Sequence, residues 1–142
     1  MAKRSLQSLG RVGGGPPPGY SWHPGYSWHV VSFDAAFRES RRVLSDSQQE
    51  HLKDMVRQLA TEDSPTHSDL CDVKPIEDYF EVRDRGGCLG GKNVRLFFGI
   101  DKPGRSIVVL GVVVKQNNGK TPNGVRILMK NRWRKHRSGE YA

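Results

Sequence analysis

Three strand-like segments in the second half of the chain constrain its fold most strongly. They are "YFEVR" (residues 79–83), "NVRLFFGI" (93–100) and "SIVVLGVVVK" (106–115), and all are rich in β-branched and aromatic residues. The links between them, "DRGGCLGGK" and "DKPG", consist largely of turn-forming residues. Strands joined by such short links pair with their neighbours in antiparallel order, so we expect a small antiparallel β-sheet.

Two helices are expected before this sheet. "AAFRESRRVL" follows Asp34, a helix-capping residue type, and places Phe33, Phe37, Val43 and Leu44 on one face. In "SDSQQEHLKDMVRQLA" the spacing of Ser47 and Glu50 matches a capping box. The apolar stripe of this second helix has helical spacing and consists of Leu52, Met55, Val56 and Leu59. We expect a helical hairpin that packs on the sheet through this stripe.

The remaining elements complete an α+β fold. "YSWHVVSF" alternates like a first strand, with Trp28, Val30 and Ser32 on one face. Residues 61–75 are expected to be loop. Residues 123–137 suggest a basic C-terminal helix whose inner face holds Val125, Leu128, Met129 and Trp133. The expected order is β-α-α-β-β-β-α, in one domain from residue 27 to residue 142.

Residues 1–26 are rich in Gly, Pro and Ser, and we interpret them as a flexible arm. The arm contains most of a duplication, "PGYSWHPGYSWH". The second copy leads into the first strand, where Trp28 can pack on the sheet. The first copy is either a tandem duplication at a domain edge or, through Tyr20 and Trp22, a device that contacts RNA or a partner by stacking.

Composition narrows the class of protein. No apolar run is long enough to span a membrane, and the N-terminus has no apolar core of a secretory signal. Cys71 and Cys88 lack the spacing of a metal site or a disulfide framework, which suggests two free thiols in a reducing cytoplasm. His23 and His29 are only two potential ligands, so we expect no functional metal site.

One glycine-rich stretch, "GGCLGGKN", nearly matches a phosphate-binding P-loop. Gly86, Gly91 and Lys92 have the required spacing, but Asn93 stands where Ser or Thr would hold magnesium. The chain also continues into a strand, whereas a P-loop leads into a helix. We therefore expect a hairpin loop, with no nucleotide or other cofactor.

Positive charge is concentrated at the end of the chain. The net charge is +8, and residues 95–142 hold 11 Lys and Arg against 2 Asp and Glu, whereas residues 1–94 hold 12 against 13. Such asymmetry suggests a polyanionic partner, most simply a nucleic acid. A solvated basic face, or a face that matches an acidic protein, is the alternative.

Four cations can meet on the expected sheet. Arg83 and Arg95 lie on neighbouring strands, Lys115 ends the third strand, and Lys120 follows on the next loop. Cations that converge on one face suit RNA cleavage without a metal, in which a ribose 2′-OH attacks the adjacent phosphate and negative charge builds up. The alternative is that these side chains are simply solvated on an open sheet face.

The order and spacing of four segments resemble the RelE/ParE superfamily of bacterial toxins, and most closely its HigB-like, phage-derived branch. The segments are "WHVVSFDAAFRE", "YFEVR", "NVRLFFGID" and "SIVVLGVVVKQNNGKTP", and the resemblance covers residues 27–137. It implies a RelE-like fold and a cytoplasmic, metal-independent mRNA endoribonuclease that acts on the translating ribosome. It also implies a cognate antitoxin partner, often a helix-turn-helix repressor.

The resemblance also assigns roles to residues. Arg83, Arg95 and Lys115 would be catalytic cations, and Tyr141 or His136 would transfer a proton. The RNA-binding residues would be Lys120, Arg126, Lys130 and Arg134. The chain departs from the branch at Gln116, where a second lysine is common, and in its more basic terminal helix. The alternatives are a non-catalytic nucleic-acid-binding module or decayed toxin, and a ParE-type inhibitor of DNA gyrase.

Overall fold

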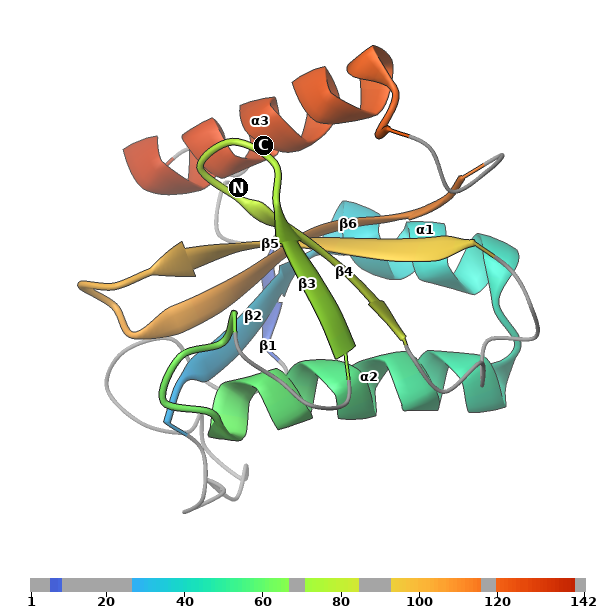
Figure 1. Cartoon of the computed structure of the whole chain (residues 1–142), viewed down its shortest axis with the longest axis horizontal. Coiled ribbons are helices and arrows are strands. Elements are labelled where there is room, and N and C mark those ends of the chain that lie inside the picture. Colours follow the sequence, from blue (N-terminus) through green and yellow to red (C-terminus); the bar gives the residue numbers. More distant parts are fainter. Residues whose placement is uncertain (1–5, 9–26, 67–70, 85–92, 116–119, 140–142) are drawn as a thin grey trace.

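The computed structural model describes residues 6–8, 27–66, 71–84, 93–115 and 120–139 and has an α+β fold. In Figure 1, α3 lies on one side of a central sheet and α2 on the other. The elements in chain order are β1 (Leu6–Ser8), β2 (His29–Phe33), α1 (Asp34–Val43), α2 (Asp46–Thr61), β3 (Cys71–Pro75), β4 (Phe80–Asp84), β5 (Val94–Asp101), β6 (Ser106–Val114) and α3 (Asn123–Ser138).

The sheet has the strand order β1-β2-β6-β5-β4-β3. Strands β3 to β6 form a continuous antiparallel meander, which confirms the antiparallel pairing expected for residues 79–115. The first long strand, β2, joins the meander by pairing in parallel with β6, so the whole sheet is mixed. The helices α1 and α2, which follow β2, cover the sheet on one face, as the α+β prediction required.

The expected loop at residues 61–75 was partly wrong, because Cys71–Pro75 forms β3 and pairs with β4 along its whole length. Its Asp, Lys and Pro residues made a strand prediction unattractive. An edge strand tolerates such residues, since one side of its backbone needs no partner. Cys71 is buried at its start, and Cys88 lies outside the described residues.

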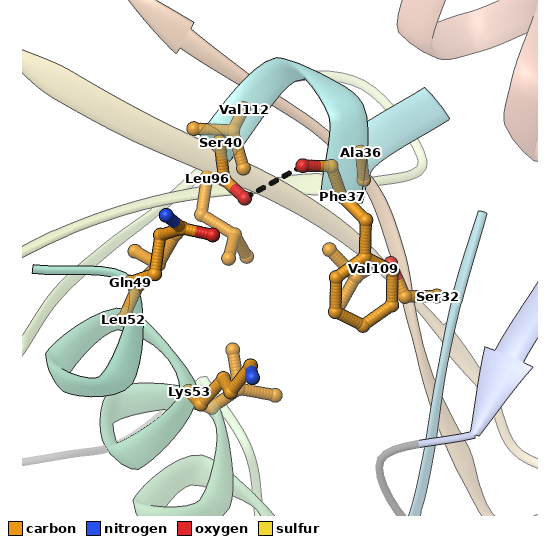
Figure 2. A pocket seen from close by; sticks show the side chains of 11 residues that line it. Ser32, Ala36, Phe37, Ser40, Gln49, Leu52, Lys53, Leu96, Val109 and Val112 are labelled. Atoms are coloured by element: carbon orange, nitrogen blue, oxygen red, sulfur yellow. Dashed lines mark hydrogen bonds between the residues drawn. The ribbon is translucent and has the colours of Figure 1, made fainter. Parts of the chain in front are cut away.

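The α2 stripe is confirmed, because Leu52, Met55, Val56 and Leu59 are all buried in one core cluster. This cluster lies between α1, α2 and one face of the sheet. A small pocket of about 30 Å³ remains within it, lined mainly by apolar side chains (Figure 2). That volume suits one or two water molecules.

The helix starts differ from the predicted ones. Phe33, and not Asp34, is the N-cap of α1, and Asp34 lies in its first turn, where a negative charge favours the helix dipole. Phe33 packs in the core on the other face of the sheet. The capping box of α2 forms between Ser45 and Gln48, two residues before the predicted pair.

The other face of the sheet is covered by α3. Met129 and Trp133 are buried there with Phe97 of β5 and Leu110 of β6, and Val125 packs at the edge of this second cluster. Leu128 was wrongly predicted to face inward. It lies about 100° away from Met129 around the helix and is exposed.

An ion pair between Glu39 of α1 and Arg132 of α3 joins the two helices at the edge of the sheet. The pairing of β2 with β6 covers Ser106–Val109, beyond which the outer edge of β6 faces α1. There Glu39 accepts a bond from the backbone N–H of Val112 (3.0 Å), and Arg132 donates to the carbonyl of Leu110 (2.8 Å). Arg132 also holds Glu39 through two bonds, of 3.0 and 2.8 Å. The pair thus satisfies backbone groups that a neighbouring strand would otherwise bind.

The second copy of the duplicated motif helps to close the core. Trp28 is buried, its indole N–H donates to the carbonyls of Glu62 and Asp63, and Arg105 lies over its ring at 4.7 Å. This confirms the packing role expected for Trp28. The strand β1 falls within the predicted arm and pairs with β2; the first copy of the motif lies outside the described residues.

Within the described part of the chain, no helix has the length and apolar character needed to cross a membrane.

Candidate functional site

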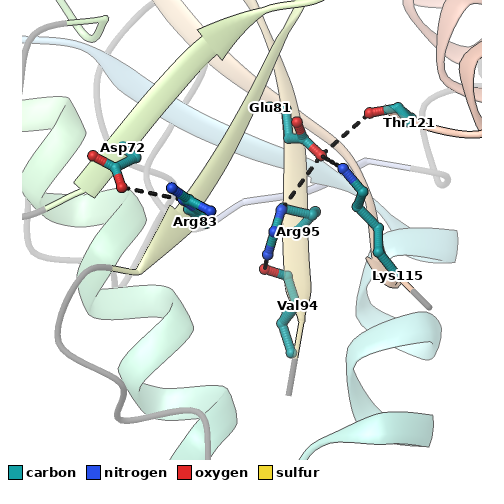
Figure 3. Close-up of polar contacts among 7 residues, drawn as sticks. All are labelled: Asp72, Glu81, Arg83, Val94, Arg95, Lys115 and Thr121. Atoms are coloured by element: carbon teal, nitrogen blue, oxygen red, sulfur yellow. Dashed lines mark hydrogen bonds and ion pairs between the residues drawn. The ribbon is translucent and has the colours of Figure 1, made fainter. Parts of the chain in front are cut away.

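On the α3 side of the sheet, a buried carboxylate forms ion pairs with two cationic side chains. Glu81 of β4 is 4% exposed, and its Oε1 atom lies 3.4 Å from Nζ of Lys115 and 3.6 Å from Nε of Arg95. The hydroxyl of Thr121, just before α3, donates to the same oxygen at 3.3 Å. Figure 3 shows these side chains pointing toward one another from β4, β5, the end of β6 and the start of the α3 region. We call these four residues the Glu81 cluster.

Strand alternation explains why these residues share one face. In β5, Val94 and Leu96 pack under α1 and α2, so Arg95 between them points to the α3 side. In β4, Val82 likewise points to the helical hairpin, so its neighbour Glu81 points to the α3 side. The pairing of β4 with β5 and of β5 with β6 brings the three strand ends together.

Arg83 adds an exposed cation beside this cluster. Its side chain is 48% exposed, and its Nε donates to Asp72 of β3 at 3.1 Å. The charge of Arg83 is close enough to lower the pKa of Arg95. Arg83, Arg95 and Lys115 thus project from the same face of the sheet, with Arg95 and Lys115 buried and Arg83 exposed.

Burial dominates the electrostatics of Arg95. Loss of solvent lowers the pKa of its guanidinium, the negative charge of Glu81 raises that pKa, and the positive charge of Arg83 lowers it again. Burial disfavours a charge unless a partner compensates for it. Glu81 thus keeps Arg95 and Lys115, which are 5% and 7% exposed, as buried cations.

The ion pairs in and beside the cluster contain more cations than acids. The side chains of Arg83, Arg95 and Lys115 carry three positive charges against the two negative charges of Asp72 and Glu81. Lys120, next to Thr121 in the chain, is exposed and adds another positive charge to this region. Of these four cations, Arg83 and Lys120 are exposed, whereas Arg95 and Lys115 are buried.

His136 lies away from these residues. It is buried, stacks on Trp133, and its Nε2 lies 2.9 Å from Asp101 at the end of β5. Arg95 is near the start of that strand, six residues earlier, which corresponds to about 20 Å. His136 therefore fixes the last turns of α3 to the sheet, and the structure does not bring it to the Glu81 cluster. Tyr141 lies outside the described residues.

The three predicted RNA-binding residues of α3 have different surroundings. Lys130 pairs with Glu77 at 3.3 Å, and the backbone carbonyl of Arg126 accepts a bond from the Tyr79 hydroxyl at 3.1 Å. Both contacts attach α3 to the turn between β3 and β4. Arg134 is exposed and forms no ion pair with another described residue.

Glu81 and Thr121 are site residues that the sequence-based reasoning did not single out. A signal for Glu81 was present in "YFEVR", where one carboxylate stands between two residues that face a core. Its partners Arg95, Lys115 and Thr121, however, are 14, 34 and 40 residues away along the chain, so the strand pairing had to be known first. In the part of the chain that is described, no three His, Cys, Asp or Glu side chains gather as metal ligands.

No protein-family model matches the chain, and the searches of curated proteins and of solved structures also gave no match.

Proposed function

We propose that this protein is a toxin of the RelE/ParE type, closest to the HigB-like branch, and that it cleaves mRNA on the translating ribosome without a metal ion. The observation that carries the proposal is the convergence of Arg95 and Lys115 on buried Glu81, with exposed Arg83 beside them. Sequence resemblance supplies the class of reaction. The proposal includes cytoplasmic action and an antitoxin partner.

The proposed mechanism uses the cations for charge stabilisation. The 2′-OH loses its proton and attacks the adjacent phosphate, the P–O5′ bond breaks, and the departing 5′-oxygen takes up a proton, which leaves a 2′,3′-cyclic phosphate and a 5′-hydroxyl. Extra negative charge lies on the phosphate oxygens during this step, and fixed cations lower the energy of that state. Arg83 and Lys120 are exposed and would contact the RNA backbone. Arg95 and Lys115 would stabilise the phosphate charge without contacting the RNA, because Glu81 holds them in fixed positions beneath that surface. Glu81 is accordingly a positioning residue in this proposal.

A reconstituted ribosome assay tests the proposal. Purified protein is added to ribosomes that carry a defined mRNA, with a chelator present, and cleavage is followed by primer extension. We expect cleavage by the wild-type protein and a loss of about 100-fold with Arg83→Gln, the scale for removal of one group that stabilises transition-state charge. Arg41→Gln, which removes an exposed cation on α1, is the matched control and should leave the rate unchanged.

The second candidate is a non-catalytic module that binds nucleic acid. It is favoured by the low exposure of Arg95 and Lys115, which are engaged with Glu81 and are not displayed to a ligand. Folded protein that binds RNA in a salt-dependent way but leaves ribosome-bound mRNA intact would replace the first proposal with this one. Absence of both cleavage and RNA binding would contradict both candidates, and a DNA supercoiling assay would then test the ParE-type alternative.

A further inference from the structure

The outward face of α3 exposes an unusual combination of side chains. Among the described residues, the exposed large hydrophobic side chains are Val114, Ile127 and Leu128, and the last two are consecutive in α3 at 61% and 41% exposure. The helix also contains six Lys and Arg residues and no Asp or Glu. Aliphatic side chains and positive charge therefore lie together on one helix.

Helical spacing divides this face into two parts. Residues three, four and seven apart lie on the same side of a helix, so Ile127 is in line with Arg134, and Leu128 with Lys135. Gly124 precedes them on the same side, and a Cβ atom there would meet nothing within 4 Å. The outward face is thus open and apolar near the start of α3 and basic near its end.

Internal ion pairs neutralise two cations along one flank of this face, since Lys130 lies three residues after Ile127 and Arg137 lies three residues after Arg134. Lys130 binds Glu77, and Arg137 binds Asp78 at 2.6 Å, both on the turn between β3 and β4. Arg134 has no such partner among the described residues. Among the described residues, Arg134, in line with Ile127, is thus a cation of this face that no acid pairs with.

We propose that this outward face binds an acidic, amphipathic peptide segment of a partner protein. Apolar side chains of the segment would cover Ile127 and Leu128, and its carboxylates would lie beside Arg134. RNA fits less well, since proteins bind single-stranded RNA with cations and stacking aromatic side chains, and the tryptophan of α3 is buried. The proposal is independent of the RNA cleavage proposed above.

Fluorescence anisotropy with three labelled probes tests this surface. The first probe is a synthetic peptide with leucines at helical spacing and glutamates elsewhere, the second has serines in place of the leucines, and the third is a short single-stranded RNA. We expect saturable binding of the leucine–glutamate peptide and a loss of at least about tenfold in affinity, equivalent to 1.4 kcal/mol, when Ile127→Ser is combined with Leu128→Ser. Arg134→Glu should weaken the same probe, whereas Arg41→Glu on α1 should not.

Since all the substituted side chains are exposed, the variants should stay folded, and urea unfolding verifies this. The proposal is overturned if the leucine–glutamate peptide does not bind, if the serine–glutamate peptide binds equally well, or if the double substitution leaves its affinity unchanged. It is also overturned if the double substitution lowers RNA affinity about tenfold, because the face would then belong to an RNA-binding surface. Unchanged RNA affinity supports it.

Discussion

Replacing Glu81 with glutamine should reveal how strongly the buried cations depend on their carboxylate. Glu81→Gln keeps the shape of the side chain and its contact with Thr121 but removes the negative charge between Arg95 and Lys115. Removing one partner of a buried ion pair typically costs 3–5 kcal/mol, because the remaining charge is buried without compensation. The two N–O distances, 3.4 and 3.6 Å, are longer than those of strong charge-assisted bonds, so we expect about 3 kcal/mol.

Urea unfolding followed by tryptophan fluorescence measures this loss. With a urea dependence of about 1.5 kcal/mol per molar, within the range for small domains, the midpoint should fall by about 2 M. Arg83→Gln is the contrasting variant, because it breaks the solvent-exposed pair with Asp72. An exposed pair contributes about 0–1 kcal/mol, so the midpoint of that variant should fall by less than about 0.7 M.

A compensated variant separates lost charge pairing from lost packing. Glu81→Leu combined with Arg95→Met and Lys115→Met removes all three charges together, and such replacements of buried ion pairs are often neutral or stabilising. The triple variant should therefore lie within about 1 kcal/mol of the wild-type protein. A loss below about 1 kcal/mol in Glu81→Gln, or a triple variant no more stable than that single variant, would refute the reasoning.

Three further predictions concern packing, ionisation and helix propensity. Gly99→Ala should destabilise the fold by about 1–3 kcal/mol in urea unfolding, because the added Cβ atom would overlap the Trp133 ring. Gly111→Ala should cost less, because the atom nearest to its added Cβ is the flexible end of a methionine side chain. Equal losses of stability in the two variants would contradict this. Burial raises the pKa of Tyr79 above 10.0, so the folded state keeps a proton that the unfolded chain releases. Stability should therefore decline as pH rises from about 10; Tyr79→Phe should decline less, and an identical decline would reject this cause. Gly124→Ala should raise the thermal midpoint, with a gain of up to about 1 kcal/mol, because its Cβ meets nothing within 4 Å; a lower midpoint would be inconsistent with an open helix position.

The parts of the fold that the sequence predicted well depend on local periodicity. The stripe of α2 and the strands β4, β5 and β6 each carry their pattern within one segment, and they formed as expected. The errors arose where a tertiary contact outweighs local preference. Strand β3 forms because β4 offers a pairing edge, and Leu128 faces outward because the centre of the α3 contact passes through Met129 and Trp133.

The candidate site shows the same division. Strand order and alternation were sufficient to place Arg83, Arg95 and Lys115 on one face. Which residues face each other across the strands decides how deeply Arg95 and Lys115 are buried and that both contact Glu81. A sequence pattern does not encode that register until the sheet is known. His136 was predicted as a proton-transfer residue because histidine commonly has that role, yet it lies near the far end of β5.

In the folded structure, the charge asymmetry of the chain also contributes ion pairs between its basic C-terminal third and its earlier part. At least five cations from the basic C-terminal third form ion pairs with acids from the first 94 residues. These pairs are Arg95 and Lys115 with Glu81, Lys130 with Glu77, Arg132 with Glu39, and Arg137 with Asp78. Much of the excess charge therefore holds the last strands and α3 against the earlier part of the fold. The exposed cations that the two proposals use are different residues, Arg83 with Lys120 in one and Arg134 in the other, so the two proposed partners would not compete for the same charges.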